Sequence, residues 1–114
     1  MCAGKYQTDN LVAIVDLNKA QIDGLVEHVM PIEPMEGKWE SFGWIAKRID
    51  GHDLQAVNDA FVWSKVKENK PKVILANTIK GKGVSFMESE LVKWHGVAPT
   101  QAQLEQALGE LKTN

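Results

Sequence analysis

The segment Leu11-Val-Ala-Ile-Val-Asp-Leu-Asn-Lys-Ala-Gln-Ile-Asp-Gly24 decides the fold of this 114-residue chain. Its first seven residues are almost continuously apolar, as a strand requires when helices cover both faces of its sheet. Residues 44–49 and 73–79 also have the length and composition of strands, although Lys47 and Arg48 interrupt the former. The sequence therefore predicts a small sheet of about three strands.

Helix signals lie between and after these strands. Pro34 suits the first turn of a helix that runs to about Phe42, and Gly43 suits its end. Thr100 and Gln103 form a capping-box pattern ahead of a last helix.

A further helix is expected between the second and third strands. Asp53 is a good N-cap residue, and the helix should end near Asn69 because Pro71 disfavours helix at the residue before it. The alternation of strands and helices implies an α/β fold, in which a parallel sheet with right-handed crossovers lies between helices in a small three-layer arrangement.

The composition is that of an ordinary globular protein, with 44% hydrophobic residues, 25% charged residues and a formal net charge of -2. This balance gives no reason to expect nucleic acid or a membrane as a partner. No apolar run approaches the ~20 residues that span a bilayer. The single cysteine, Cys2, excludes an internal disulfide and a multi-thiolate metal site. These features fit a cytoplasmic protein.

Two motifs resemble the transketolase family. The pattern Val15-Asp-x-Asn18 followed by Ile22-Asp-Gly24 resembles the distal part of the thiamine diphosphate motif of these enzymes. The segment Lys93-Trp-His-Gly-Val-Ala-Pro99 resembles the His-Gly-x-x-Pro-like segment that precedes the last helix of their cofactor domain. Residues 42–44, 50–53 and 78–83 follow the family as well. The chain is thus similar, over nearly its whole length, to the distal half of a transketolase diphosphate-binding domain, and to the two-subunit bacterial type.

The resemblance implies a site for thiamine diphosphate and Mg²⁺. Asn18 corresponds to a magnesium ligand, and the main-chain carbonyl of Ala20 corresponds to a second one; oxygen donors at the end of a parallel strand suit such an ion. Ile22 corresponds to an apolar residue that packs on the cofactor. His95 corresponds to a histidine near the cofactor diphosphate and the bound sugar, where it could donate a hydrogen bond or move a proton. Taken alone, Asn18 and His95 would also fit ordinary turn residues.

The stretch Lys80-Gly-Lys-Gly83 looks like a phosphate-binding loop but lacks the spacing of one. We therefore expect a flexible exit from the third strand at these residues.

The resemblance also implies that residues 1–114 form a partial thiamine diphosphate domain. A Gly-Asp-Gly and early histidines, which the family places before this segment, and a glutamate of its pyrimidine-binding domain have no counterpart in these residues, and Met1 corresponds to an internal position. The implied function is that of a truncated transketolase component, related to the transfer of a two-carbon ketol unit between sugar phosphates. We expect it to be inactive without a complementing transketolase chain. The alternatives are a folded fragment without cofactor or activity, and an unrelated oligomerising α/β domain.

A sheet of three strands should leave an apolar edge exposed, and residues 11–15 are the strand expected there. Unpaired backbone groups beside valine and isoleucine side chains favour pairing with another copy. The sequence therefore predicts a homodimer or higher oligomer that buries residues 11–15 or residues 1–6.

Overall fold

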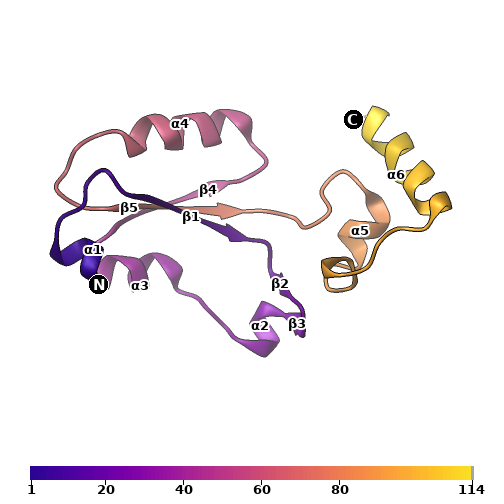
Figure 1. Cartoon of the computed structure of the whole chain (residues 1–114), viewed down its shortest axis with the longest axis horizontal. Helices are drawn as coiled ribbons and strands as arrows, with labels where there is room; N and C mark the ends of the chain where they lie inside the picture. Colours follow the sequence, from indigo (N-terminus) through magenta and orange to yellow (C-terminus); the bar gives the residue numbers. More distant parts are fainter. Residues whose placement is uncertain (114) are drawn as a thin grey trace. The chain divides into compact units, whose positions relative to one another are not determined.

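A computed structural model describes residues 1–113. They form two compact units, one made of Met1–Leu17 with Ile32–Thr78 and the other of Asn18–Pro31 with residues 79–113. The first unit contains the parallel sheet, and the second contains the segments that follow the ends of two of its strands (Figure 1).

The first unit alternates strands with helices. Its elements are α1 (Cys2–Lys5), β1 (Val12–Leu17), α3 (Met35–Ser41), β4 (Ile45–Asp50), α4 (Leu54–Ser64) and β5 (Lys72–Asn77). All pairs are parallel and the strand order is β1-β5-β4, so Val12 and Ile45 both pair with Lys72. Helix α4 lies along one face of the sheet and α3 along the other (Figure 1). The predicted three-layer α/β architecture is confirmed.

The core of this unit lies between the sheet and α3. Leu17, Val73 and Leu75 are its buried centre. Partly buried residues pack around them, among them Trp39 and Trp44, whose rings meet edge to face at 4.7 Å between centroids. The central strand β5 is buried over most of its length, which explains its nearly continuous apolar sequence.

Strand β1 forms one edge of the sheet, as expected. Alternate residues of β1 face the core, and those on the opposite face are less covered: Ile14 is 57% exposed. Leu11, just before the strand, is 43% exposed. This edge therefore presents apolar side chains beside unpaired backbone groups.

The expected boundaries of two helices need correction. Pro34 is the N-cap of α3 and lies just outside its first turn. Asp53 caps α4 as predicted, because its carboxylate accepts hydrogen bonds from the N–H groups of Gln55 and Ala56 at 2.9 and 3.2 Å. The prediction that this helix ends near Asn69 is wrong, since α4 ends at Ser64.

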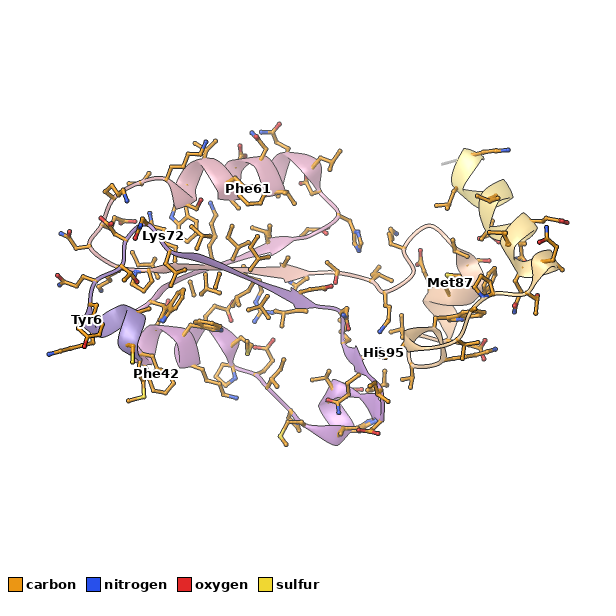
Figure 2. All side chains as sticks on the ribbon, in the orientation of Figure 1. Tyr6, Phe42, Phe61, Lys72, Met87 and His95 are labelled. Carbon is orange, nitrogen blue, oxygen red and sulfur yellow. The ribbon has the colours of Figure 1, made fainter. Side chains whose placement is uncertain are left out.

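A buried lysine lies at the carboxyl end of α4. The side chain of Lys72 is fully buried, and its ammonium group donates to the carbonyls of Trp63, at 3.1 Å, and Val66 (Figure 2). The carbonyl of Trp63 also accepts the N–H of Val66 at 3.1 Å, three residues on, so the helix closes with a tighter last turn. Lys72 also pairs with Glu68 at 2.9 Å and lies over the ring of Trp63. Lys72 therefore binds carbonyl groups at the end of α4 and in the turn that follows it.

The second unit consists of short elements and one longer helix. These are β2 (Ala20–Gln21), β3 (Gly24–Leu25), α2 (Val26–Val29), α5 (Ser85–Ser89), the 3₁₀ turn η1 (Lys93–His95) and α6 (Gln101–Thr113). The capping box of α6 is confirmed: Thr100 N donates to Gln103 Oε1 at 2.9 Å and Gln103 N to Thr100 Oγ1 at 3.4 Å. Within the described residues, no helix has the length and apolar character to cross a bilayer.

The carboxylate of Glu110 ties α6 to the start of α5. It accepts hydrogen bonds from the backbone N–H and the hydroxyl of Ser85, at 2.6 and 2.8 Å. The backbone hydrogen bond is the main reason that the pKa of Glu110 is lowered. The contact fixes the start of α5 against the last helix.

Candidate functional site

Asn18 stands directly after β1, at the carboxyl end of a parallel strand. Its side-chain oxygen accepts the backbone N–H of Ala20 at 3.1 Å, and Lys19 between them has a left-handed backbone with φ of 66°. Such a turn is common for asparagine. An amide oxygen has two acceptor positions, so the bond to Ala20 leaves one available for a cation or another donor.

Ala20 and Ile22 belong to the small hairpin that follows. Ala20 is buried and pairs with Leu25 across β2 and β3. Ile22 lies in the turn of this hairpin and is 69% exposed. The hairpin thus presents an isolated apolar side chain close in sequence to the amide of Asn18.

The chemistry of the Asn18 turn suits part of a magnesium site. An amide oxygen and a main-chain carbonyl are hard donors of the kind that Mg²⁺ takes together with carboxylate, phosphate or water oxygens. Among residues 1–113, no group of three or more histidine, cysteine, aspartate or glutamate side chains could hold a metal ion. The oxygens of Asn18 and Ala20 are thus of a chemical class that Mg²⁺ accepts as ligands.

His95 is the last residue of η1 and is exposed (Figure 2). Its Nδ1 lies 2.9 Å from the ammonium nitrogen of Lys80. The preceding residue, Trp94, packs edge to face on Phe86 at 5.1 Å between centroids and donates its indole N–H to the carbonyl of Phe86 at 3.2 Å. These contacts anchor η1 to α5 and thereby hold the backbone that carries the side chain of His95.

The loop from Lys80 to Gly83 does not have the geometry of a phosphate cradle. The N–H of Gly83 donates to the carboxylate of Glu88 at 2.7 Å, and the N–H of Lys82 donates to the carbonyl of Ile79 at 3.2 Å. These backbone donors have partners within the protein and do not converge on an open position. This agrees with the expectation that the segment is an exit from the last strand.

Between the two predicted groups of site residues no direct bond is found. In the described part of the chain, no hydrogen bond or ion pair joins His95 to residues 18–22. The structure therefore brings together Asn18 with Ala20, and His95 with Lys80.

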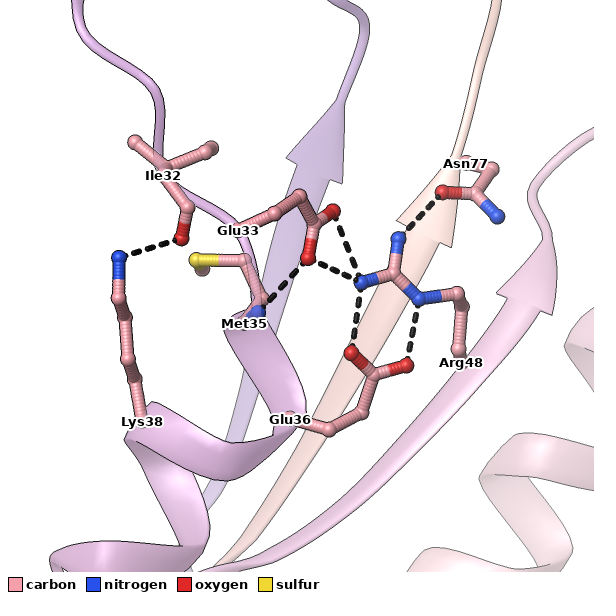
Figure 3. Close-up of polar contacts among 7 residues, drawn as sticks. All are labelled: Ile32, Glu33, Met35, Glu36, Lys38, Arg48 and Asn77. Atoms are coloured by element: carbon pink, nitrogen blue, oxygen red, sulfur yellow. Dashed lines mark hydrogen bonds and ion pairs between the residues drawn. The ribbon is translucent and has the colours of Figure 1, made fainter.

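The first unit contains a polar network at the carboxyl end of its sheet (Figure 3). Arg48 of β4 binds Glu36 through two hydrogen bonds, from Nε at 2.5 Å and from Nη2 at 2.7 Å. It also contacts Glu33 at 2.9 Å and the side-chain oxygen of Asn77 at 3.0 Å. The bond to Arg48 is the main reason that the pKa of Glu36 falls from 4.5 to about 2, and Glu36 in turn raises the pKa of Arg48.

This network joins elements and leaves little capacity for a ligand. Arg48 has five N–H donors, and the bonds to Glu33, Glu36 and Asn77 engage every nitrogen of its guanidinium group. In the sequence, Arg48 is recognisable only as an interruption of an apolar strand. Two carboxylates close in sequence, Glu33 just before α3 and Glu36 in its first turn, are a local signal for a shared cation. The identity of that cation depends on the topology, which places β4 beside α3.

Comparison with known proteins identifies the family. Residues 1–112 match the family described as "Transketolase, thiamine diphosphate binding domain". The chain is 43% identical over 112 residues to a 6-deoxy-6-sulfo-D-fructose transketolase subunit of Clostridium sp. (strain MSTE9), and 40% identical over 111 residues to a subunit of the apulose-4-phosphate transketolase of Phocaeicola vulgatus. The matches cover 98% and 97% of this chain. The chain spans about 40% of the length of these curated relatives.

Solved structures agree with this match. A transketolase from Campylobacter jejuni superposes with a TM-score of 0.88 at 30% sequence identity, over 97% of this chain and 17% of that one. A transketolase from Pichia stipitis shares the fold at a TM-score of 0.63 and 22% identity, over 98% of this chain and 20% of its own. The fold, the order of the motifs and the match over residues 1–112 together lead to one conclusion: the chain belongs to the transketolase family and corresponds to its thiamine diphosphate binding domain.

Proposed function

We propose that these residues form part of the cofactor site of a transketolase, which transfers a two-carbon ketol unit between ketose and aldose phosphates. The observation that carries this proposal is the family match over residues 1–112, together with the position of Asn18 at the carboxyl end of β1. Ligands of open parallel sheets bind at that edge.

Each predicted site residue has a role in this proposal. The side-chain oxygen of Asn18 and the carbonyl of Ala20 hold Mg²⁺, and Ile22 packs against the bound cofactor. His95 binds an anionic oxygen of the diphosphate or of the sugar substrate. Thiamine diphosphate, when bound, supplies the stabilisation of a carbanion that side chains cannot provide. The residues of this chain bind, orient and support it electrostatically.

The site requires partners beyond these 114 residues. The remaining magnesium ligands and the rest of the cofactor cleft come from other transketolase segments, in the same polypeptide or in a complementing chain. Two curated relatives are named as transketolase subunits, which supports an assembly of this kind. The 114 residues alone are therefore expected to bind the cofactor weakly and to show no turnover with sugar phosphates.

A second candidate is a folded, non-catalytic α/β domain that self-associates. The 57% exposure of Ile14 on the edge strand favours it. Activity that depends on thiamine diphosphate would be expected for the transketolase site and not for the non-catalytic domain.

A chimeric enzyme provides the test. Residues 1–112 replace the matching segment of the Clostridium subunit, which is combined with its complementing chain and assayed for ketol transfer with 6-deoxy-6-sulfo-D-fructose as donor. We expect activity, and we expect His95→Ala to lower kcat by about 100-fold, as is typical when an electrostatic donor is removed. His28→Ala is the matched control, because that histidine is exposed in α2. Full activity of His95→Ala would remove His95 from the site.

A further inference from the structure

We propose that Lys80 is a positioning residue for His95, and that it fixes the tautomer of the imidazole, with the hydrogen on Nε2 as a hydrogen-bond donor. The inference deepens the proposed function and rests on it, since it concerns how His95 acts within the same site. The sequence is compatible with two roles for this histidine, hydrogen-bond donation and proton transfer. The contact with Lys80 distinguishes between them.

The chemistry of the contact fixes the proton position. The ammonium nitrogen of Lys80 lies 2.9 Å from Nδ1 of His95. A lysine ammonium has three donors and no acceptor, so Nδ1 must be the acceptor in this bond. A neutral imidazole with an unprotonated Nδ1 carries its hydrogen on Nε2.

The position of Lys80 follows from the loop that begins with it. Gly81 has φ of 73°, and a Cβ there would lie 2.4 Å from the Cβ of Met87 in α5. Glycine allows the loop to approach α5 this closely. The carbonyl of Gly81 accepts the N–H of Val84 at 3.0 Å, and Gly83 is tied to Glu88. The loop is therefore folded onto the same short helix to which Trp94 anchors η1.

The charges around the pair favour an anionic ligand. In η1, Lys93 is paired with Glu90 at 2.6 Å, and in the loop Lys82 lies 3.8 Å from Glu88. Among the described residues, Lys80 has no carboxylate within ion-pair distance. Its charge therefore remains unbalanced beside His95. A fixed positive charge next to an N–H donor suits a phosphate or diphosphate oxygen.

This arrangement assigns His95 the role of a donor. A general base needs a free lone pair on the nitrogen that faces the substrate. With Lys80 on Nδ1, the lone pair of the ring is engaged and the opposite nitrogen presents a hydrogen. His95 then stabilises negative charge on an oxygen without accepting a proton.

The tautomer is measured directly by nitrogen NMR of the 114-residue chain, at about pH 8, where an ordinary histidine is neutral. Long-range ¹H–¹⁵N correlations are recorded for its three histidines, and His95→Gln identifies the signals of His95. We expect one tautomer with hydrogen on Nε2. Lys80→Met should move both ring nitrogens toward the averaged shifts of exposed His28, whereas Lys82→Met should leave them unchanged. A wild-type His95 that already shows averaged shifts, or shifts insensitive to Lys80→Met, overturns the proposal.

Activity of the chimera tests what the donor does. In His95→Gln the amide nitrogen stands near the place of Nε2, and in His95→Asn it stands near the place of Nδ1. For a donor at Nε2 we expect His95→Gln to keep activity within about tenfold and His95→Asn to lose about 100-fold. Equal, severe losses in both variants would indicate a base and would refute the donor role. An inactive chimera would count against the proposed function alone, because the NMR result does not depend on the cofactor.

Discussion

The burial of Lys72 could not be predicted from the sequence around it. A lysine at the start of a strand is normally read as exposed, because lysine is seldom fully buried without a partner. Here the side chain is fully buried and its ammonium group bonds to the carbonyls of Trp63 and Val66. Nothing in the local pattern predicts this, since the contact depends on how α4 and β5 meet in three dimensions.

The first prediction concerns the stability that Lys72 provides. Lys72→Met keeps most of the apolar stem but removes the donor for two carbonyls, so the free energy of unfolding should fall by about 1–3 kcal/mol. Urea denaturation followed by circular dichroism measures it. Lys70→Met, at an exposed position two residues earlier, should stay within about 0.5 kcal/mol of the wild type. Equal stabilities of Lys72→Met and the wild type would show that water replaces the ammonium group without cost.

The second prediction concerns pH and Glu36. The pKa of this carboxylate is about 2 in the folded protein, mainly through its hydrogen bond with Arg48, against 4.5 ordinarily. Because the folded value is the lower one, the stabilisation is complete above the ordinary value and is lost as the pH falls from 4.5 through about 2. The pair is partly exposed, so we expect only about 1 kcal/mol from it.

Unfolding measured across this pH range tests the assignment. Glu36→Gln should flatten the loss of stability between pH 4.5 and about 2, since the group that gains a proton is absent. Glu40→Gln, an exposed position on the same helix, should retain the wild-type slope. If both variants kept that slope, the acid sensitivity would have to come from other carboxylates.

At the scale of elements, the N-terminal caps of the helices could be predicted more accurately than the carboxyl end of α4. Asp53 and the pair Thr100–Gln103 are local signals, and the structure confirms both. Helix α4 ends at Ser64, five residues before the predicted Asn69, and the carbonyl of Trp63 near this end is also bound by Lys72 of β5. Local capping needs only a few neighbouring residues, whereas helix ends can depend on the register of a strand that comes later in the chain.

The third prediction is argued from strand β1. It is an edge strand with Ile14 57% exposed, so pairing with another copy would cover apolar surface and satisfy backbone groups. We expect the 114-residue chain to form a dimer or higher oligomer at tens of micromolar, and we expect Ile14→Lys to dissociate it. Size-exclusion chromatography with light scattering gives the masses.

A control for this surface comes from a helix of the same unit. Val62→Lys changes an apolar side chain of α4 that is 59% exposed, and it should leave the oligomer intact. A monomeric wild type would refute the assembly. An oligomer that persists in Ile14→Lys would refute the surface.

At the scale of the whole molecule, the sequence predicted the sheet and the family but only part of the candidate site. Asn18 and His95 could be named because their motifs are continuous in sequence. The bond between Lys80 and His95, and the network around Arg48, join residues from separate elements. These contacts therefore could be identified only from the three-dimensional structure.

The central claim is that the turn at Asn18 binds the metal of a transketolase cofactor site. Calorimetric titration of thiamine diphosphate with Mg²⁺ into the chimera tests it most directly. We predict tight binding that Asn18→Ala weakens by at least about tenfold, roughly 1.4 kcal/mol, while Asn58→Ala on α4 leaves it unchanged. The 114-residue chain alone should bind weakly. Equal affinities of Asn18→Ala and the unmodified chimera would contradict the account.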